Sequence, residues 1–279
     1  MNPFKLTEPS CISFSGGRTS AYMLWRFIDA NDGLPDDCIV TFANTGKEHE
    51  ATLRFVDRCS KMWDVPIVWI EYKAAEKTED RWQIVDFETA ARNGEPFEAA
   101  INQYKALPNP ASRYCTDKLK ITPIARYLAS LGVVEGVTAG TKFCIVGIRA
   151  DEQRRAAKFE PHRRPLVAAG VTKEDVAAFW RQQPFDLELP NHNGVTPHGN
   201  CDLCYLKGNG LIKSLIEENP DSADWWAEQE EKKDRECQTG HTNYFRIDRP
   251  SYRAMQKMAR EQGSLDLIPT ETIPCFCGD

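Results

Sequence analysis

The sequence predicts an α/β protein, built on a parallel sheet with helices on both faces. Three short apolar runs have the length and composition of buried strands, namely 10–14, 38–43 and 66–71. Two segments with apolar residues at helical spacing lie between them, at 21–28 and 50–63. Strands that alternate with helices and short loops are typical of a parallel sheet covered on both faces. Ligands bind such sheets beyond the carboxyl ends of the strands, so the loops after the first two strands are the expected place for a site.

The second half of the chain adds further elements. A helix is expected over about 123–131, and the apolar run 144–148 indicates another strand. Thr172 and Asp175 have the spacing of a capping box, which predicts that a helix begins there. Another helix is expected near 209–218.

Composition along the chain suggests two parts. Residues 73–112 are polar and weakly periodic, and from Pro184 the chain becomes loop-rich. We therefore expect a nucleotide-binding α/β domain over 1–183 and a loop-rich, cysteine-containing C-terminal region over 184–279.

The bulk composition favours a nucleotide or small-molecule enzyme of the cytoplasm. No run approaches the roughly 18 apolar residues of a membrane span, and the first residues lack the pattern of a signal peptide. The net charge of −6 argues against a broad nucleic-acid surface, although a local basic patch is compatible with it. Ten cysteines are unusual where disulfides are rare, so metal binding, redox chemistry or plain burial is expected of them.

A phosphate-binding loop is predicted directly after the first strand. Two glycines there let backbone N–H groups approach phosphate oxygens, and the start of the next helix adds partial positive charge. Hydroxyl groups and a guanidinium within the same stretch can bind an anion as well. The alternative is a glycine turn without a ligand. The predicted loop is Ser15-Gly16-Gly17-Arg18-Thr19-Ser20.

This loop resembles the PP-loop of the adenine nucleotide alpha-hydrolase-like superfamily, whose pattern is Ser-Gly-Gly-x-Asp-Ser. Thr19 stands where that pattern has aspartate. Three more segments resemble, in the expected order, the phosphoadenylylsulfate (PAPS) reductase-like branch of the superfamily, namely 44–48, 113–123 and 147–152. The resemblance covers about residues 10–165 and implies a sheet flanked by helices, with an adenine nucleotide over the strand ends.

The same resemblance implies roles for single residues outside the loop. Asn44, Thr45 and Arg149 would bind the nucleotide, and Lys118 would act in catalysis. Mg²⁺ would accompany the nucleotide if it is ATP. Each role has a plainer alternative, because Asn44 and Thr45 can simply shape a turn, and Lys118 and Lys120 can be solvated surface residues.

The cysteines suggest a metal centre. Cys201 and Cys204 have the spacing at which two thiolates bind one metal. Adenylylsulfate reductases of the resembled family hold a [4Fe–4S] cluster with a Cys-Cys pair and a distant Cys-x-x-Cys. Tyr114 replaces the first cysteine of that pair, so the resemblance implies Cys115, Cys201 and Cys204 as cluster ligands. Zinc and the absence of any metal remain alternatives.

The chain end offers candidate nucleophiles. The family's C-terminal Glu-Cys-Gly-x-His motif is absent, and the nearest cysteines are Cys275 and Cys277. A flexible tail can bring such a thiol over a nucleotide site, where it would be catalytic. The alternative is that Cys275 or Cys277 supplies the fourth metal ligand.

Two versions of a PAPS reductase-like enzyme fit these observations. In one, a thiolate attacks a sulfonucleotide and a thiol reductant releases sulfite. In the other, ATP is cleaved between the α and β phosphates. This activates an oxygen of a small or nucleic-acid acceptor for replacement by sulfur, from a sulfur donor, or by nitrogen. A hypothesis of another class is a nucleotide- or nucleic-acid-associated binding protein without catalysis, or a zinc-stabilised interaction module.

Overall fold

The computed structural model describes residues 2–192, 194–236 and 243–262. Its central feature is a five-stranded sheet in the order β4-β3-β2-β1-β5. Strand β1 runs parallel to β2 and β5, β2 runs parallel to β3, and only β4 within this sheet is antiparallel to its neighbour. The predicted α/β fold with a mostly parallel sheet is thus confirmed. The strands are β1 (Ser10–Ser13), β2 (Cys38–Asn44), β3 (Ile67–Glu71), β4 (Gln83–Val85) and β5 (Ile145–Val146).

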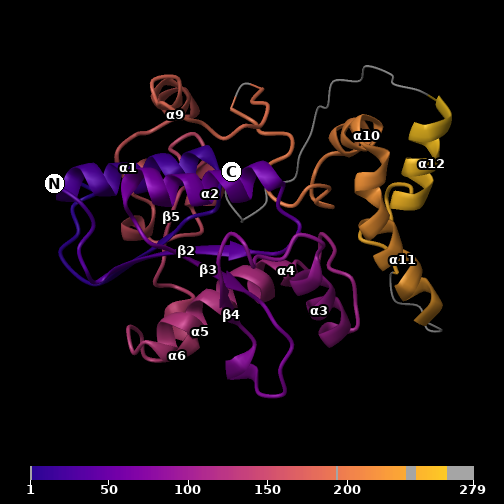
Figure 1. The fold of residues 1–279 in the computed structure, drawn as a ribbon, viewed down its shortest axis with the longest axis horizontal. Helices are drawn as coiled ribbons and strands as arrows, with labels where there is room; N and C mark the ends of the chain where they lie inside the picture. The colour runs from indigo at the N-terminus through magenta and orange to yellow at the C-terminus, as the bar shows by residue number, and fades with distance from the viewer. Residues whose placement is uncertain (1, 193, 237–242, 263–279) are drawn as a thin grey trace.

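One face of the sheet is covered by α1 (Arg18–Asn31) and α2 (Glu50–Trp63), which lie above it in Figure 1. Their buried side chains join strand residues such as Ile12 and Val40 in one apolar core. The short helix α9 (Lys173–Trp180) packs on α1 and adds Trp180 to that core. It begins at the predicted capping box, in which the Thr172 N–H and hydroxyl donate to Asp175 Oδ2 at 2.8 and 2.9 Å.

The opposite face is covered by α5 (Thr122–Ser130) and the adjoining α6 (Gly136–Gly140), below the sheet in Figure 1. Ile124, Tyr127 and Leu128 of α5 bury themselves against strand residues of this face. Short elements complete this domain. They are α3 (Glu95–Tyr104), α4 (Tyr114–Thr116), α7 (Gln153–Ala156), α8 (Pro165–Ala168), the 3₁₀ turns η1 (Thr78–Asp80) and η3 (Pro161–Arg163), and a π-helical segment, η2 (Asp117–Ile121).

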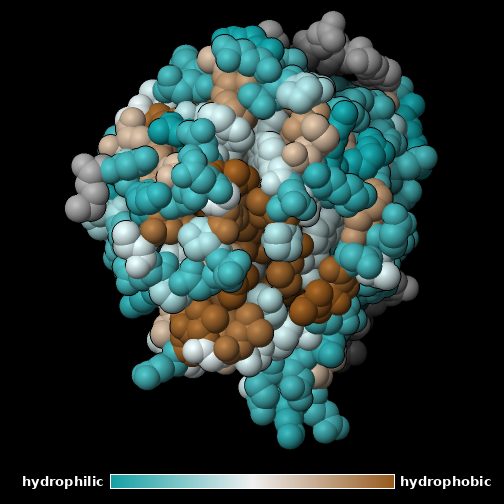
Figure 2. Space-filling view, turned by 60° about the vertical axis from the view of Figure 1, so that its left-hand side comes forward, coloured by the Kyte–Doolittle hydropathy of each residue, from teal (hydrophilic) through white to brown (hydrophobic). Residues whose placement is uncertain are grey.

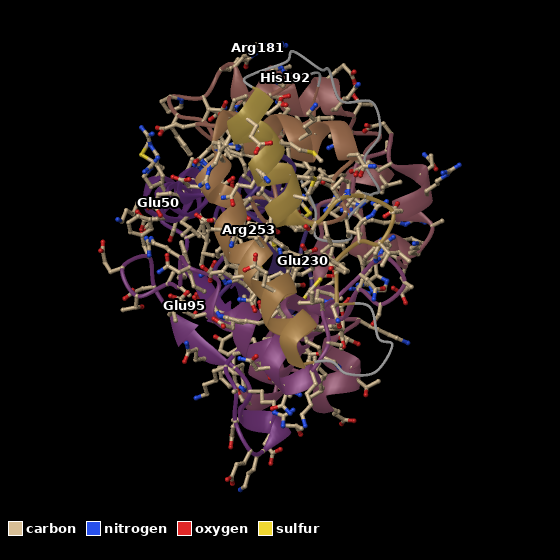
Figure 3. All side chains as sticks on the ribbon, turned by 90° about the vertical axis from the view of Figure 1, so that its right-hand side faces the viewer. Glu50, Glu95, Arg181, His192, Glu230 and Arg253 are labelled. Atoms are coloured by element: carbon tan, nitrogen blue, oxygen red, sulfur yellow. The ribbon has the colours of Figure 1, made fainter. Side chains whose placement is uncertain are left out.

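A helical lobe lies beside the sheet, to the right in Figure 1 and facing the viewer in Figure 3. It contains α10 (Asn209–Glu218), the turn η4 (Pro220–Ala223), α11 (Asp224–Glu236) and α12 (Tyr252–Gln262). Its aromatic core of Trp226, Phe245 and Tyr252 also includes Phe97 of α3. Likewise, Leu187 packs in the core of the first sheet face. Each of these two apolar cores therefore contains residues from both sides of the expected domain boundary at 183/184.

The surface is not uniformly polar. Figure 2 shows apolar side chains gathered in a band on one face of the molecule, bordered by hydrophilic ones. Among the described residues, no helix has both the length and the apolar character needed to cross a membrane.

Candidate functional site

The predicted phosphate loop lies between the end of β1 and the start of α1. Gly16 has φ +79°, a conformation that side chains disfavour, and a Cβ there would lie 2.6 Å from the Thr52 methyl carbon. Gly17 precedes α1 in an extended conformation, and no side chain caps the helix at that position. The first N–H groups of a helix have no partner within it, so this end of α1 presents donors and partial positive charge to an anion.

Hydroxyl groups brace the loop from within. Ser15 Oγ donates to Ser20 Oγ over 2.9 Å, and Ser20 Oγ donates to the Gly17 carbonyl over 3.0 Å. A Cβ on Gly147 would lie 3.0 Å from Ser20 Cα, so the residue that follows β5 closely approaches the first turn of α1. These contacts hold the loop in shape before any ligand arrives.

Two hollows meet at this loop. The smaller one, here termed the loop pocket, is lined by the backbone at 15–17 and by Glu48, Lys120 and Asn200. The larger one, the strand-end cavity, has a volume of about 370 Å³ and lies at the carboxyl ends of β1, β2 and β5. Ser15 and Lys120 line both hollows, so the two lie side by side.

The strand-end cavity combines apolar walls with charged groups. Phe14, Ala43, Ile124, Val146 and Phe159 supply apolar surface, and Arg113, Lys120 and Arg163 supply cationic groups. Ligand cavities in proteins have this composition, with a few polar groups placed among apolar walls.

The second predicted loop, after β2, is held by its own side chains. Asn44 is fully buried, and its Nδ2 donates to Glu71 Oε1 over 2.6 Å and to the Ala91 carbonyl over 2.8 Å. Thr45 donates from its N–H and its hydroxyl to Glu48 Oε2, each over 2.8 Å. Asn44 and Thr45 therefore shape this turn, and the side chain that it delivers to the loop pocket is Glu48.

Glu48 is an acid that the sequence did not single out. Its side chain is buried, and its Oε1 lies 3.4 Å from Lys120 Nζ. The Asn-Thr-Gly-Lys-Glu stretch contained the signal, since the residue lies in a loop that follows a parallel strand. Beside it, His49 caps α2 with its Nδ1, and burial together with nearby His198 lowers the pKa of His49.

Lys120, rather than Lys118, faces the site. Both lie on the π-helical segment Asp117–Ile121, a kind of turn that often marks functional positions. Lys118 Nζ pairs with Asp117 over 2.6 Å and lies over the Tyr104 ring. Residues two apart on a helix point to different sides, so only one of the two can line the pockets. The expected role of Lys118 is not supported by this geometry.

Arg18 has a role different from the anion contact that was expected. Its guanidinium donates to both carboxylate oxygens of Asp186, over 2.7 and 2.8 Å, and to the carbonyls of Leu187 and Leu189. This clamp attaches the segment after α9 to the start of α1. These acceptors occupy the Nε and Nη2 donors, so the contacts of Arg18 hold the fold together and do not face a ligand.

Arg149, which was expected to bind the nucleotide, contacts the predicted phosphate loop through the side chain of Thr19. Its Nη1 donates to the Thr19 hydroxyl over 3.1 Å, and its Nε donates to Asp151 Oδ1 over 3.0 Å. The side chain is buried and also lies near Glu152. Thr19, in the position where the PP-loop pattern has aspartate, is thus a hydrogen-bond partner of a cation.

The cysteines expected to bind a cluster lie close to this site but form no ligand group. Cys201 Sγ lies 3.5 Å from the Thr45 hydroxyl, and Cys115 Sγ lies 3.3 Å from the hydroxyl of Tyr205. Cys201 and Cys204 are buried, joined by a turn in which the Cys204 N–H donates to the Cys201 carbonyl. Within the part of the chain that the structure describes, no three His, Cys, Asp or Glu side chains converge as metal ligands would. Cys275 and Cys277 lie outside the described residues.

The segment that carries Cys201 is attached to the second loop. Residues Glu48 and Cys201 form an isolated antiparallel bridge, and the Asp202 N–H donates to the Lys47 carbonyl over 2.8 Å. Lys47 Nζ in turn pairs with Asp202 Oδ2 over 2.9 Å. The C-terminal region thereby supplies one wall of the loop pocket, where Asn200 lies.

Comparisons with known proteins reveal relatives in a phage and an archaeon. The uncharacterized nin region protein ORF290 of Escherichia phage lambda is 35% identical over 207 residues, which are 72% of this chain and 67% of the phage protein. The uncharacterized protein MJ0066 of Methanocaldococcus jannaschii is 25% identical over 164 residues, 58% of this chain but only 28% of that longer protein. No protein-family model matches the chain.

Proposed function

The chain belongs to the family of the phage lambda nin region protein ORF290, and we propose that it is a PAPS reductase-like enzyme of the PP-loop kind. It would bind an adenine nucleotide and use it for sulfur transfer. The observation that carries this proposal is the contact between the two hollows. An uncapped helix start lies at the loop pocket, and Ser15 and Lys120 link that pocket to an apolar cavity at the strand ends.

The two hollows suit the two ends of a nucleotide. The apolar walls at Phe14, Ile124 and Phe159 can enclose a purine ring. The phosphates would then extend past Ser15 into the loop pocket, toward the backbone N–H groups at the start of α1 and toward Lys120. An anion at that point is stabilised by the helix dipole and by the ammonium group together.

Glu48 favours ATP over a sulfonucleotide. A buried carboxylate repels a bare phosphate or sulfate, but it attracts a nucleotide that carries a divalent cation. Its Oε2 accepts two hydrogen bonds from Thr45, which fixes the carboxylate at the edge of the pocket. Mg²⁺ is commonly held by one or two carboxylates together with substrate phosphates, so this residue fits the ion. Bound there, Mg²⁺ would neutralise charge that develops on the phosphates.

The proposed reaction begins at the α phosphorus of ATP. An oxygen of the acceptor attacks that phosphorus, the bond to the β-phosphate oxygen breaks, and pyrophosphate leaves. The acceptor is then adenylylated, and a sulfur nucleophile can displace AMP from it. Lys120 and the N–H groups of the loop bind the leaving phosphates, which carry growing negative charge.

The sulfur in this reaction would come from a persulfide that a sulfur donor forms on a cysteine thiol. The outer sulfur of the persulfide displaces AMP from the acceptor, and a thiol reductant then cleaves the S–S bond, which leaves the acceptor as a thiol and forms a disulfide. The resemblance implied a [4Fe–4S] cluster held by Cys115, Cys201 and Cys204. Within the described residues these three thiols do not converge as metal ligands do, and the proposed sulfur transfer does not depend on a cluster. The acceptor is a small molecule or a nucleic acid.

Calorimetry with ATP and Mg²⁺, adenylylsulfate and PAPS tests the nucleotide. We expect Lys120→Ala to weaken ATP binding at least tenfold, whereas Lys118→Ala, two residues away, serves as a matched control with nearly unchanged affinity. Glu48→Gln should weaken binding of the Mg²⁺ complex and strengthen sulfonucleotide binding, because the repelling charge is removed. Equal effects at positions 118 and 120 would contradict the proposed placement.

Turnover separates the remaining versions. Pyrophosphate release from ATP that depends on an acceptor supports the proposal. Sulfite release from PAPS or adenylylsulfate favours the reductase version, and binding of all three without turnover favours a binding protein. Anaerobic purification with iron, sulfide and zinc analysis tests the metal. A colourless protein without iron, after cluster-supporting expression, would refute the cluster.

A further inference from the structure

Two cysteines that the nucleotide chemistry does not use lie side by side on neighbouring strands. Cys11 belongs to β1, and Cys144 comes directly before β5. The parallel register pairs Ile12 with Ile145, which sets the two cysteines next to each other at one level of the sheet. Cys144 Sγ donates to Cys11 Sγ over 3.0 Å. Both thiols are free.

The two thiols differ in access. Cys144 lines the strand-end cavity, whereas Cys11 is fully buried behind it, 3.6 Å from the Thr41 hydroxyl. Burial, with Cys144 beside it, raises the pKa of the Cys11 thiol well above its ordinary value. A small reagent that enters the cavity therefore meets Cys144 first. Arg163 Nε donates to the Cys144 carbonyl over 2.9 Å and fixes the backbone at that point.

We propose that Cys144 and Cys11 form a peroxide-reactive dithiol in the wall of the strand-end cavity. The Cys144 thiolate attacks one oxygen of a hydroperoxide, the O–O bond breaks, and water or an alcohol leaves, so that Cys144 becomes a sulfenic acid. The Cys11 thiol then attacks the Cys144 sulfur, the S–S bond forms and a second water leaves. For hydrogen peroxide, two thiols and one peroxide give one disulfide and two waters.

The spacing of neighbouring strands falls within the range of Cα separations that disulfides span. Neighbouring strands lie about 4.8 Å apart, and the Cα atoms of disulfides usually lie roughly 4.4–6.8 Å apart. Both side chains already point to the same apolar cluster on one face of the sheet. A neighbouring resolving thiol also protects a cysteine from irreversible oxidation, because the disulfide can be reduced again.

Peptide mapping of the reduced protein after a hydrogen peroxide titration tests the proposal. We expect a disulfide-linked pair of peptides that contain Cys11 and Cys144, and the pair should disappear on treatment with a thiol reductant. Cys11→Ser should instead trap a sulfenic acid at Cys144 that dimedone labels. Cys59→Ser is the control variant, since Cys59 is buried in the core of the other sheet face, and it should retain the linked pair. Peroxide-driven loss of thiols without the Cys11–Cys144 link, or with Cys144 linked elsewhere, would overturn it.

A second readout rests on the proposed function. If a nucleoside occupies the strand-end cavity, saturating ATP should slow alkylation of Cys144 by iodoacetamide at least fivefold, while labelling of half-buried Cys38 stays unchanged. The linked pair without nucleotide protection would refute the cavity as the nucleoside site and leave the dithiol standing. Protection by ATP without the linked pair would support the cavity as the nucleoside site and refute the dithiol.

Discussion

Replacing Gly16 by alanine tests the construction of the phosphate loop. The residue has φ +79°, where a side chain costs about 1–2 kcal/mol. The added Cβ would also lie 2.6 Å from the Thr52 methyl carbon and 3.2 Å from the Phe42 ring. Overpacking of this kind costs about 1–3 kcal/mol. The two contributions together predict a loss of unfolding free energy of roughly 2–5 kcal/mol.

Gly132 provides the matched control. Its φ is +72°, and a Cβ there meets no atom within 4 Å. Gly132→Ala should therefore show the conformational cost alone, about 1–2 kcal/mol. Urea denaturation of the two variants, followed by circular dichroism, measures the difference, which is the contribution of the crowded contact.

A second substitution separates the clash from other effects. Thr52→Ala removes the methyl group that the new Cβ would meet, so Gly16→Ala should cost less in that background than in the native chain. Equal losses for Gly16→Ala and Gly132→Ala, or no relief from Thr52→Ala, would refute the reasoning. Gly16→Ala should also weaken ATP binding, because the loop backbone can no longer keep its shape.

Three other predictions concern the frame around the site. Arg18→Ala should lower the unfolding free energy by about 2–3 kcal/mol, because it removes charged hydrogen bonds to half-exposed Asp186 and to two carbonyls. Arg18→Lys should not restore the lost unfolding free energy in the same denaturation assay. Thr172→Ala should cost about 1 kcal/mol by removing the cap of α9, also measured by denaturation. Burial raises the pKa of Glu230 from 4.5 to about 7. Between pH 4.5 and 7 the Glu230 carboxyl therefore stays protonated in the folded state, whereas it is ionised in the unfolded chain. The unfolding free energy should therefore fall as pH rises through this window, by up to about 1.4 kcal/mol per pH unit, and Glu230→Gln should flatten the profile.

The buried position of Glu230 has a clear structural cause. Its carboxylate accepts the Phe245 N–H over 3.2 Å and the Tyr252 N–H at the start of α12 over 2.9 Å. Figure 3 shows the residue on α11, in the helical lobe that faces the viewer. These hydrogen bonds favour the ionised form and burial opposes it, and the net effect is the raised pKa. A pH-independent denaturation midpoint between pH 5 and 7 would contradict this account.

Elements with a local signal could be predicted from the sequence. The apolar runs predicted β1, β2 and β3, and the spacing of Thr172 and Asp175 predicted α9, because strands and caps depend on neighbours along the chain. The strand expected over 144–148 is shorter, only Ile145–Val146, because the chain turns at Gly147 to approach α1. The helices α3, α11 and α12 were missed. The sequences of α11 and α12 are mostly polar, and α3, although it buries Phe97 and Ile101, lies within the weakly periodic stretch 73–112.

The site was harder to predict than the fold. The sequence predicted a phosphate loop at 15–20, which lies between β1 and α1, but it could not tell which side chains face the adjoining pocket. Arg18 was expected at an anion, yet its partners at 186–189 lie more than 160 positions away. Lys118 and Lys120 fit the same motif, and only the path of the π-helical segment decides between them. Such choices depend on tertiary contacts that no local pattern contains.

The distribution of charge around the loop explains how threonine can stand at position 19. An aspartate there would lie beside Arg149, which already pairs with Asp151, and threonine keeps that contact as a hydrogen bond to an uncharged acceptor. A carboxylate instead reaches the loop pocket from the neighbouring strand, as Glu48, where Lys120 balances it. Threonine at position 19 is therefore compatible with an acidic group in the pocket. Under the proposed function, Glu48 rather than residue 19 would be the carboxylate that holds Mg²⁺ beside the phosphates.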